Sequence, residues 1–155
     1  MCGIIARVGD GSSVDKLVSG LENLEYRGYD SAGVAVQNGT GIKVYKQSGR
    51  VDELKREVEG ATSDGNLGIG HTRWSTHGPP TDENAHPHTD ESSDVAVVHN
   101  GVIENYDEIR AFLRADGVEF TSETDTEVVP HLMQRYLEGG VDPETAFRET
   151  GRSLE

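Results

Sequence analysis

A single cysteine stands at the second position of this 155-residue sequence, in the opening stretch MCGIIARVG. If the initiator methionine is removed, which a small second side chain favours, Cys2 carries both a thiol and the free α-amine of the chain. An α-amine has a pKa of roughly 7.7 to 8.0, so an appreciable fraction is neutral near pH 7. One residue would then supply a nucleophile and its base. The alternative is a small apolar side chain buried in the first strand.

Two charged residues further along the chain suit the recognition of a zwitterion. Arg73, in HTRWSTHG, can hold a carboxylate through two parallel hydrogen bonds, a geometry that lysine cannot reproduce. Asp125, in SETDTE, can accept hydrogen bonds from an ammonium group. Each also has a simpler interpretation, with Arg73 in a surface ion pair and Asp125 as the N-cap of the helix that follows.

The segment HNGVIEN supplies hydrogen-bond donors at the end of a predicted strand. The side-chain amide of Asn100 and the backbone N–H of Gly101 can stabilise the oxyanion that forms during acyl transfer. An ordinary Asn-Gly turn is the alternative. That alternative is weakened because the following residues VIENY run into a helical pattern instead of returning as a strand.

Histidines offer a rival hypothesis, a zinc site in a binding or structural protein. The candidates are His71, His77, His86, His88 and His99. Their spacing argues against this, because no HExxH or CxxC motif is present and no third ligand follows the proline-flanking pair at a familiar interval. We expect no metal and no cofactor.

The elements that must position these residues can be predicted from hydrophobic periodicity. Apolar runs predict strands at 2–8, 32–37, 42–47, 66–73 and 94–100, the first of them buried and the second and third joined by the hairpin signal NGTG. Helical spacing predicts a helix at 12–25, with a capping box from Ser12 to Asp15, and a short amphipathic helix at 51–60. The long polar loop at 73–93 is of a length typical of functional loops.

The chain after residue 105 has a helical pattern. Pro130 lies inside one of these helices, so we expect a kink or a late helix start there. Asp142 and Pro143 suit an N-cap and a first turn. About five strands and four helices, without regular strand-helix alternation, predict an α+β layered fold in a single domain.

Composition narrows the class of protein. There are 28 acidic and 14 basic residues, a formal net charge of -14, which makes nucleic acid an unsuitable partner and suggests an acidic surface adapted to a salty cytosol. No apolar run is long enough to span a membrane, and no secretory signal follows the start, so we expect no membrane partner and a cytoplasmic location. One cysteine cannot form an internal disulfide.

Five motifs occur in order after the terminal cysteine: LEYRGYDSAG at 24–33, HTRWSTHG at 71–78, NAHPH at 84–88, HNGVIEN at 99–105 and SETDTE at 122–127. Together they resemble the glutaminase domain of the glucosamine-6-phosphate synthase family, which are class II glutamine amidotransferases of the N-terminal nucleophile hydrolase superfamily. The wording EYRGYDSAG resembles this family more than the amidophosphoribosyltransferases.

The resemblance implies a four-layer αββα sandwich, of which residues 1–155 would form an incomplete glutaminase domain without later strands and without the isomerase domains. It implies catalytic roles for Cys2, Asn100 and Gly101. It implies glutamine binding and cover by a loop through Arg73, Trp74, Thr76, His77 and Asp125. Arg27 and Gly28 would support the nucleophile, although Gly28 could instead be a helix C-cap.

The same resemblance implies that L-glutamine is hydrolysed through a thioester and that its ammonia passes to C-terminal sugar isomerase domains, in a full-length homodimer. This chain alone would not make an amino sugar, and a retained Met1 would remove the base. Three alternatives stay open: the glutaminase domain of a related class II enzyme such as an amidophosphoribosyltransferase, an inactive glutamine-binding remnant, and another hydrolase of the superfamily that acts on peptides.

Overall fold

Four antiparallel strands form the main sheet of the structure, a computed structural model that describes residues 1–61, 65–75 and 78–155. The strands are β1 (Gly3–Val8), β2 (Ser31–Asn38), β3 (Gly41–Ser48) and β4 (Leu67–Arg73), and their order across the sheet is β1-β4-β2-β3. The predicted hairpin between β2 and β3 is confirmed, with Asn38 opposite Gly41.

The register of this sheet brings distant parts of the sequence to one edge. Gly3 at the start of β1 lies opposite Thr72, and Ser31 at the start of β2 lies opposite Arg73. Because both pairs are antiparallel, the beginnings of β1 and β2 flank the end of β4. The residues just before β1 and just after β4 are therefore neighbours in space.

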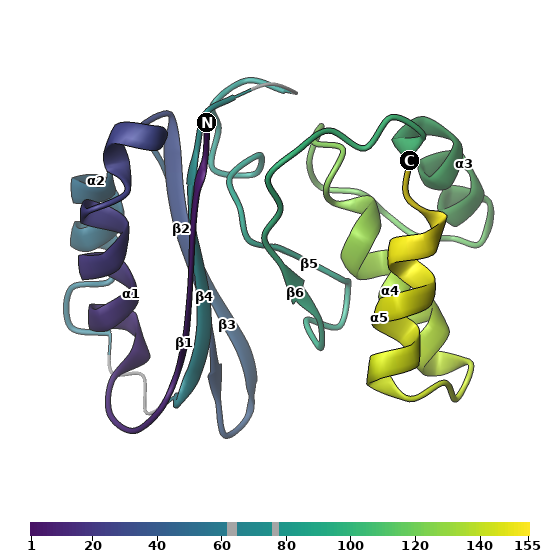
Figure 1. Ribbon diagram of the computed structural model, residues 1–155, viewed down its shortest axis with the longest axis horizontal. Helices are drawn as coiled ribbons and strands as arrows, with labels where there is room; N and C mark the ends of the chain where they lie inside the picture. Colours follow the sequence, from purple (N-terminus) through teal and green to yellow (C-terminus); the bar gives the residue numbers. More distant parts are fainter. Residues whose placement is uncertain (62–64, 76–77) are drawn as a thin grey trace.

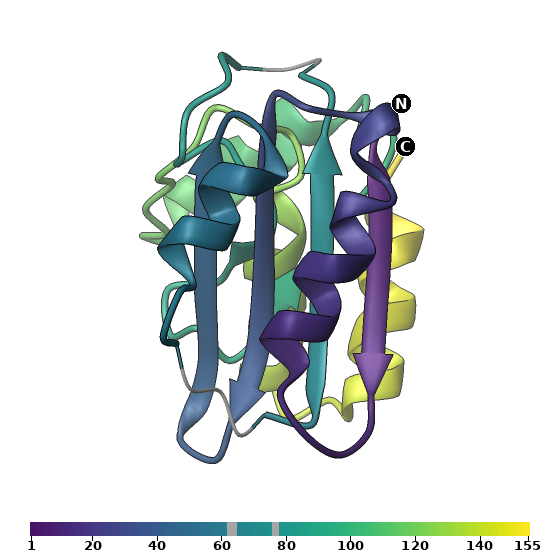
Figure 2. The ribbon, with the colours of Figure 1, turned by 90° about the vertical axis from the view of Figure 1, so that its left-hand side faces the viewer.

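Two helices, α1 (Ser13–Glu22) and α2 (Val51–Glu57), cover one face of the sheet (Figures 1 and 2). Their apolar residues face the sheet, and helices and strands together form the main core: Val14, Leu17, Val18, Leu21, Val51 and Leu54 from the helices, with Val34 and Val36 from β2. Each fully buried leucine contributes roughly 1.5 to 3 kcal/mol. The predicted capping box is wrong, because Ser12 makes no side-chain cap and the hydroxyl of Ser13 donates to the Gly65 carbonyl instead.

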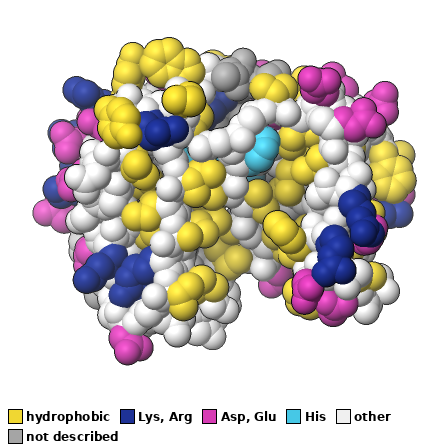
Figure 3. All heavy atoms as spheres, in the orientation of Figure 1, with side chains coloured by type: hydrophobic (Ala, Val, Ile, Leu, Met, Phe, Trp, Pro, Cys, Tyr) yellow, Lys and Arg dark blue, Asp and Glu magenta, His cyan; other side chains and the backbone are white. Residues whose placement is uncertain are grey.

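A second, smaller sheet lies against the other face (Figure 1). It consists of β5 (His88–Thr89) and β6 (Ala96–Val97), so the strand predicted at 94–100 is reduced to two residues and pairs with a strand inside the predicted loop. Between the sheets lies an apolar groove lined by Ala35, Ile42, Leu67, Ile69 and Ala96. Hydrophobic side chains accordingly gather along the middle of the molecule in Figure 3.

Three helices, α3 (Tyr106–Ala115), α4 (Val128–Glu138) and α5 (Pro143–Ser153), form the outer layer beyond the small sheet (Figure 1). Ile103, Leu113, Val128 and Leu132 form their core. The late helix start is confirmed, since Pro130 is the third residue of α4, where a missing N–H is tolerated. The predicted N-cap is also confirmed, because Asp142 accepts a hydrogen bond from the Thr145 N–H.

The layers therefore run helix, sheet, sheet, helix, and the predicted α+β class is confirmed. The described residues form six strands and five α-helices, against the expected five and four. The first strand is not buried as predicted: β1 is an edge strand of alternating exposure, with Ile4 41% and Val8 82% exposed. None of the described helices is long and apolar enough to cross a membrane.

Candidate active site

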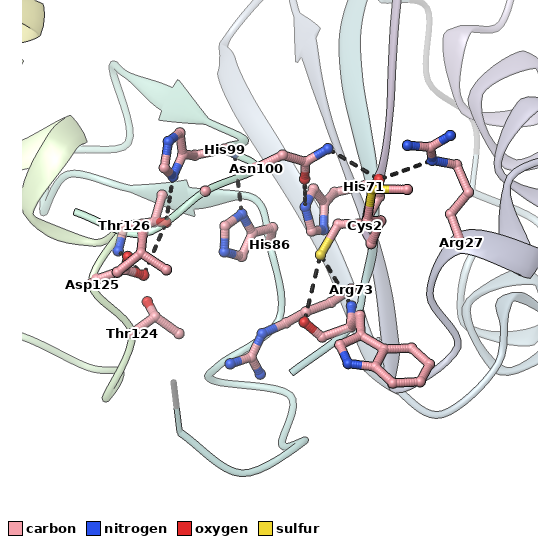
Figure 4. A pocket seen from close by; sticks show the side chains of 14 residues that line it. Cys2, Arg27, His71, Arg73, His86, His99, Asn100, Thr124, Asp125 and Thr126 are labelled. Carbon is pink, nitrogen blue, oxygen red and sulfur yellow. Dashed lines mark hydrogen bonds between the residues drawn. The ribbon is translucent and has the colours of Figure 1, made fainter. Parts of the chain in front are cut away.

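The thiol of Cys2 lies at the sheet edge where β1 begins and β4 ends (Figure 4). Its Sγ accepts a hydrogen bond of 3.1 Å from the backbone N–H of Trp74, the residue after β4. The cysteine is partly exposed and lines a cavity. The thiol is therefore accessible from the cavity, unlike the buried apolar side chain considered as the alternative.

The backbone carbonyl of Cys2 is held from two further elements. The Nε of Arg27 donates to it at 3.2 Å, and the Nδ2 of Asn100 donates to it at 3.1 Å. Arg27 ends the short 3₁₀ helix Glu25–Arg27, whereas Asn100 follows β6. Three separate parts of the chain thus fix the position of this residue (Figure 4).

Gly28 allows the 3₁₀ helix to pack closely against the end of β4. A Cβ at this position would lie 2.6 Å from the carbonyl carbon of Arg73 and 2.9 Å from the nitrogen of Trp74. A larger residue would therefore push the helix away from the strand end. Gly28 is also the C-cap of that helix, as the simpler interpretation held, and its N–H donates to the Glu25 carbonyl.

A cavity of about 450 Å³ opens between this sheet edge and the loops before α3 and α4. It brings together most residues predicted from the sequence, namely Cys2, Arg27, Arg73, Trp74, Asn100, Gly101 and Asp125. Thr76 and His77 lie outside the described residues. Sequence reasoning did not assign a role in the site to other lining residues, among them His71, His86, His99, Thr124 and Thr126, although all of them stand in the quoted motifs.

Arg73 reaches the cavity from inside the protein and is only 4% exposed, which contradicts the simpler interpretation as a surface ion-pair residue. Its guanidinium donates to the carbonyls of Gly78 and Pro79. Burial lowers the pKa of Arg73, while the neighbouring Cys2 and the carboxylates of Asp30 and Asp125 oppose that shift. An arginine remains protonated in such a setting, so the cavity contains a fixed positive charge.

Asp125 supplies a negative charge to the same cavity. It is not the N-cap of α4, since Glu127 occupies that position. Instead its Oδ2 accepts a hydrogen bond of 2.8 Å from the Ile103 N–H, and its Oδ1 accepts one of 2.9 Å from the Thr126 N–H. These bonds orient the carboxylate and leave it further lone pairs for a ligand.

Asn100 and Gly101 line the cavity from the loop after β6, and Figure 4 shows the Asn100 amide directed towards the backbone of Cys2 and the ring of His71. The Oδ1 of Asn100 lies 2.9 Å from Nε2 of His71. Gly101 has φ +149°, a conformation that other residues rarely adopt, and a Cβ there would lie 3.0 Å from the ring of His99. The chain then leads into α3, so the simple hairpin turn considered as the alternative is not formed.

The histidine rings in and behind the cavity wall contact one another. The rings of His71 and His86 stack with centroids 4.3 Å apart, and His88 packs edge-on against His86 at 4.6 Å. The Nε2 of His88 shares a hydrogen bond with the hydroxyl of Thr124. Burial lowers the pKa of His71 to about 4 and that of His88 to about 3, so both rings are neutral near pH 7. No group of three metal-ligating side chains suits a metal ion within the part of the chain that the structure describes.

Glu127 organises the segment that carries Asp125. It is 2% exposed, and its carboxylate accepts hydrogen bonds from the N–H and hydroxyl groups of Thr121 and Ser122. Burial alone would raise the pKa of Glu127, but His131, Ser122 and Thr121 together hold it well below the ordinary value of 4.5. The carboxylate is therefore charged and ties both ends of the segment together.

The chain is similar to known proteins over almost its whole length. A family model described as a glutamine amidotransferase domain matches residues 55–146. The chain is 50% identical to a glutamine–fructose-6-phosphate aminotransferase (isomerizing) from Methanothermobacter thermautotrophicus over 99% of its own length and 26% of that protein. It is 53% identical to the enzyme of the same name from Thermus thermophilus, of which it covers 25%. The chain thus spans about a quarter of these curated relatives.

Two solved structures share the fold. One is a glutamine phosphoribosylpyrophosphate amidotransferase from B. subtilis, at 25% identity and a TM-score of 0.82, and the other is an allosteric regulatory enzyme of purine biosynthesis, at 26% identity and a TM-score of 0.84. The chain is covered completely in both comparisons and corresponds to 33% of each of those chains.

Proposed function

Since this chain belongs to the glutamine amidotransferase domain family and has the αββα fold of the N-terminal nucleophile hydrolases, we propose that it releases ammonia from L-glutamine through a thioester on Cys2. One observation carries the proposal. A thiol, a pair of candidate oxyanion donors and two opposite charges line a single cavity of about 450 Å³, a size suited to a small ligand.

The charges define how glutamine would lie. Arg73 would hold the α-carboxylate and Asp125 the α-ammonium, which leaves the side-chain amide to reach Cys2. Buried charges make such contacts strong because water does not compete for them. A zwitterion clamp favours a free amino acid over a peptide, whose internal residues lack both charges.

The first half-reaction is an attack by Cys2 Sγ on the side-chain amide carbon. The oxygen of that amide becomes an oxyanion, to which the Nδ2 of Asn100 and the N–H of Gly101 would donate. When the tetrahedral intermediate collapses, the carbon–nitrogen bond breaks, the proton that the base took from the thiol passes to the nitrogen, and ammonia leaves. A γ-glutamyl thioester remains on the enzyme.

The second half-reaction consumes one water molecule. The water attacks the thioester carbon, passes a proton to the base, and the sulfur leaves as the thiol with release of glutamate. The proposed base in both halves is the α-amine of Cys2, which becomes available once Met1 is removed. Trp74, Thr76 and His77 belong to the loop that we propose covers the bound glutamine and limits its hydrolysis by stray water.

In the longer protein to which such a domain belongs, we propose that residues 1–155 are part of a glutaminase unit whose ammonia serves to aminate fructose 6-phosphate on C-terminal sugar isomerase domains. We also propose a homodimer and a cytoplasmic location for that protein. Sequence identities of 50% and 53% to glutamine–fructose-6-phosphate aminotransferases support fructose 6-phosphate as the acceptor of the ammonia. Phosphoribosylpyrophosphate is the weaker alternative acceptor, because the chain is only 25% identical to the glutamine phosphoribosylpyrophosphate amidotransferase.

The test is an intact-mass measurement of the purified chain before and after treatment with a diazo-ketone analogue of glutamine. We expect loss of Met1 and a single adduct on Cys2 that glutamine blocks. Cys2→Ala is the matched control, because alanine is also small and should also allow removal of Met1. A processed chain that binds glutamine but forms no adduct would instead identify an inactive glutamine-binding remnant.

A further inference from the structure

His71 touches the candidate oxyanion donor from inside the protein. It lies on β4, is 1% exposed, and places its Nε2 2.9 Å from the Oδ1 of Asn100. From the sequence His71 was only a candidate metal ligand, without a role in the glutaminase site. In Figure 4 the Asn100 amide lies between the His71 ring and the backbone of Cys2.

The neighbours of Asn100 decide which way its amide points. The carbonyl of Cys2, 3.1 Å away, can only accept a hydrogen bond, so the atom facing it must be the amide nitrogen. The amide oxygen then faces His71, and the Nε2 of His71 must carry the hydrogen. With the amide reversed, two oxygens would face each other at the Cys2 carbonyl.

The setting of His71 favours a single proton, held on Nε2. Its Nδ1 is buried without a hydrogen bond of good geometry among the described residues, and a second proton there would add a charge that burial disfavours despite the nearby His99 backbone. Its ring stacks on that of His86. Burial lowers the pKa of His71 to about 4, against smaller opposing effects of its hydrogen bond with Asn100 and of the His99 backbone.

We propose that His71 is a positioning residue for the glutaminase reaction, which fixes the amide of Asn100 with Nδ2 towards Cys2 so that the second Nδ2 hydrogen remains for the oxyanion. This inference rests on the proposed function. One amide hydrogen bonds the Cys2 carbonyl, and the other is free to bond the oxygen that becomes negative during attack. Without His71 only the Cys2 carbonyl would favour this orientation, and the amide would spend more of its time turned away from the position of the oxyanion.

The experiment compares three changes in the full 155-residue chain with its Met1 removed. His71→Leu keeps an apolar volume but removes the donor, and we expect kcat for glutamine to fall about 10- to 100-fold with KM within about twofold, somewhat less than the loss of an oxyanion donor itself. His71→Gln retains an N–H near the position of Nε2, and we expect it to restore most of the lost kcat. Thr150→Val is the control, because Thr150 is also a buried polar residue, at 2% exposed, but lies on α5, no residue of which lines the cavity.

A double-mutant cycle tests whether His71 acts through Asn100. In an Asn100→Ala background, His71→Leu should cause almost no further loss of kcat, because the amide that it positions is gone. If the loss of kcat in the double variant equals the product of the two single losses, the proposal is overturned. It is also overturned if His71→Gln and His71→Leu lower kcat by the same factor. If His71→Leu does not fold, the comparison of His71→Gln with wild type still decides, because a fall as large as that of Asn100→Ala would overturn it.

A spectroscopic measurement separates this inference from the proposed function. Nitrogen NMR of the histidine rings should show His71 as the Nε2–H tautomer near pH 7, and Asn100→Ala should shift that signal and no other histidine as strongly. If wild type shows this signal but does not hydrolyse glutamine, the proposed function fails while the pairing stands. A Nδ1–H tautomer in an active chain would overturn the positioning role alone.

Discussion

The cavity has two walls that are held in place by different means. The strand wall, Cys2 and Arg73, stands at the ends of β1 and β4 and rests on sheet register and the apolar core below it. The loop wall, Asn100, Gly101 and the segment 121–127, rests on buried polar side chains and their hydrogen bonds. Apolar packing responds little to pH, whereas a buried polar network depends on the protonation state of each member. The two walls should therefore fail under different perturbations.

The largest expected effect is on chemistry at the strand wall. Cys2→Ala should lower glutamine hydrolysis at least about 10³-fold, because no other group can form the thioester. Glutamine affinity, measured by calorimetry, should stay nearly unchanged, since the charges of Arg73 and Asp125 remain. Residual hydrolysis close to wild type would remove Cys2 as the nucleophile.

Acid should lower the stability of the native protein through the buried histidines that lie between the walls. The pKa of His71 is lowered from 6.5 to about 4, so the unfolded chain binds a proton below pH 6.5 that the native chain does not bind. The free energy of unfolding should therefore fall as the pH drops from 6.5 towards 4, by about 3 kcal/mol for a shift of this size. Above pH 6.5 this contribution should be constant.

Urea unfolding between pH 4 and 8 measures this dependence. His88, whose pKa is lowered to about 3, adds a loss of the same sign. His88→Gln removes one titrating ring and should make the slope shallower. An unfolding free energy that is flat from pH 4.5 to 7 would contradict the prediction that these rings are neutral in the native protein.

Glu127→Gln should break the loop wall without touching the strand wall. The carboxylate accepts four hydrogen bonds from Thr121 and Ser122, and a neutral amide cannot accept all of them. We expect a loss of about 2 kcal/mol in the free energy of unfolding, since hydrogen bonds to charged groups are worth roughly 1.5 to 3 kcal/mol each. The fall in the free energy of unfolding below pH 4.5 should also become shallower. The lowered pKa of Glu127 gives a stabilisation that is complete above pH 4.5 and is lost as the pH falls below it, and glutamine does not titrate.

Glu127→Gln should also change the kinetics of glutamine hydrolysis, through Asp125 two residues away in the sequence. If the segment 121–127 loses its fixed geometry, KM for glutamine should rise while kcat changes less. An unchanged KM with lower stability would show that Glu127 supports the fold alone.

Arg73→Lys tests the strand wall by geometry, because the positive charge is kept. A lysine cannot form two parallel hydrogen bonds with a carboxylate, so KM for glutamine should rise about 10- to 100-fold, as expected for one lost hydrogen bond to a charged group. Thermal unfolding should change little. A normal KM would contradict the assignment of Arg73 to the α-carboxylate.

The strand wall could be predicted from the sequence more completely than the loop wall. The apolar spacing of Val14, Leu17 and Leu21 and the hairpin signal between β2 and β3 are local signals, and local patterns specify such elements well. The edge position of β1 is not local, because pairing partners across a sheet are set by the whole topology. Its exposure was therefore predicted wrongly.

The loop wall depends on contacts between residues far apart in the chain. The motifs identified Asn100 and Asp125, but not that His71 would meet Asn100 or that Asp125 would bond the Ile103 N–H. Buried polar networks leave no periodic pattern, because each hydrogen bond is satisfied by whichever group lies within reach. The same applies to Ser12, whose predicted cap gave way to a longer-range bond from Ser13 to Gly65.

The smallest expected effect comes from a helix end remote from both walls. Asp142 caps α5 by accepting a hydrogen bond of 3.1 Å from the Thr145 N–H, on the outer layer of the molecule. Asp142→Ala should lower the midpoint of thermal unfolding by a few degrees, as loss of an N-cap does, and Asp142→Asn should recover most of it because asparagine also caps helices. Neither change should alter kcat or KM, since no residue of α5 lines the cavity. A fall in kcat with Asp142→Ala would mean that the outer helices transmit strain to the loop wall, and the two walls would then not be independent of the layer behind them.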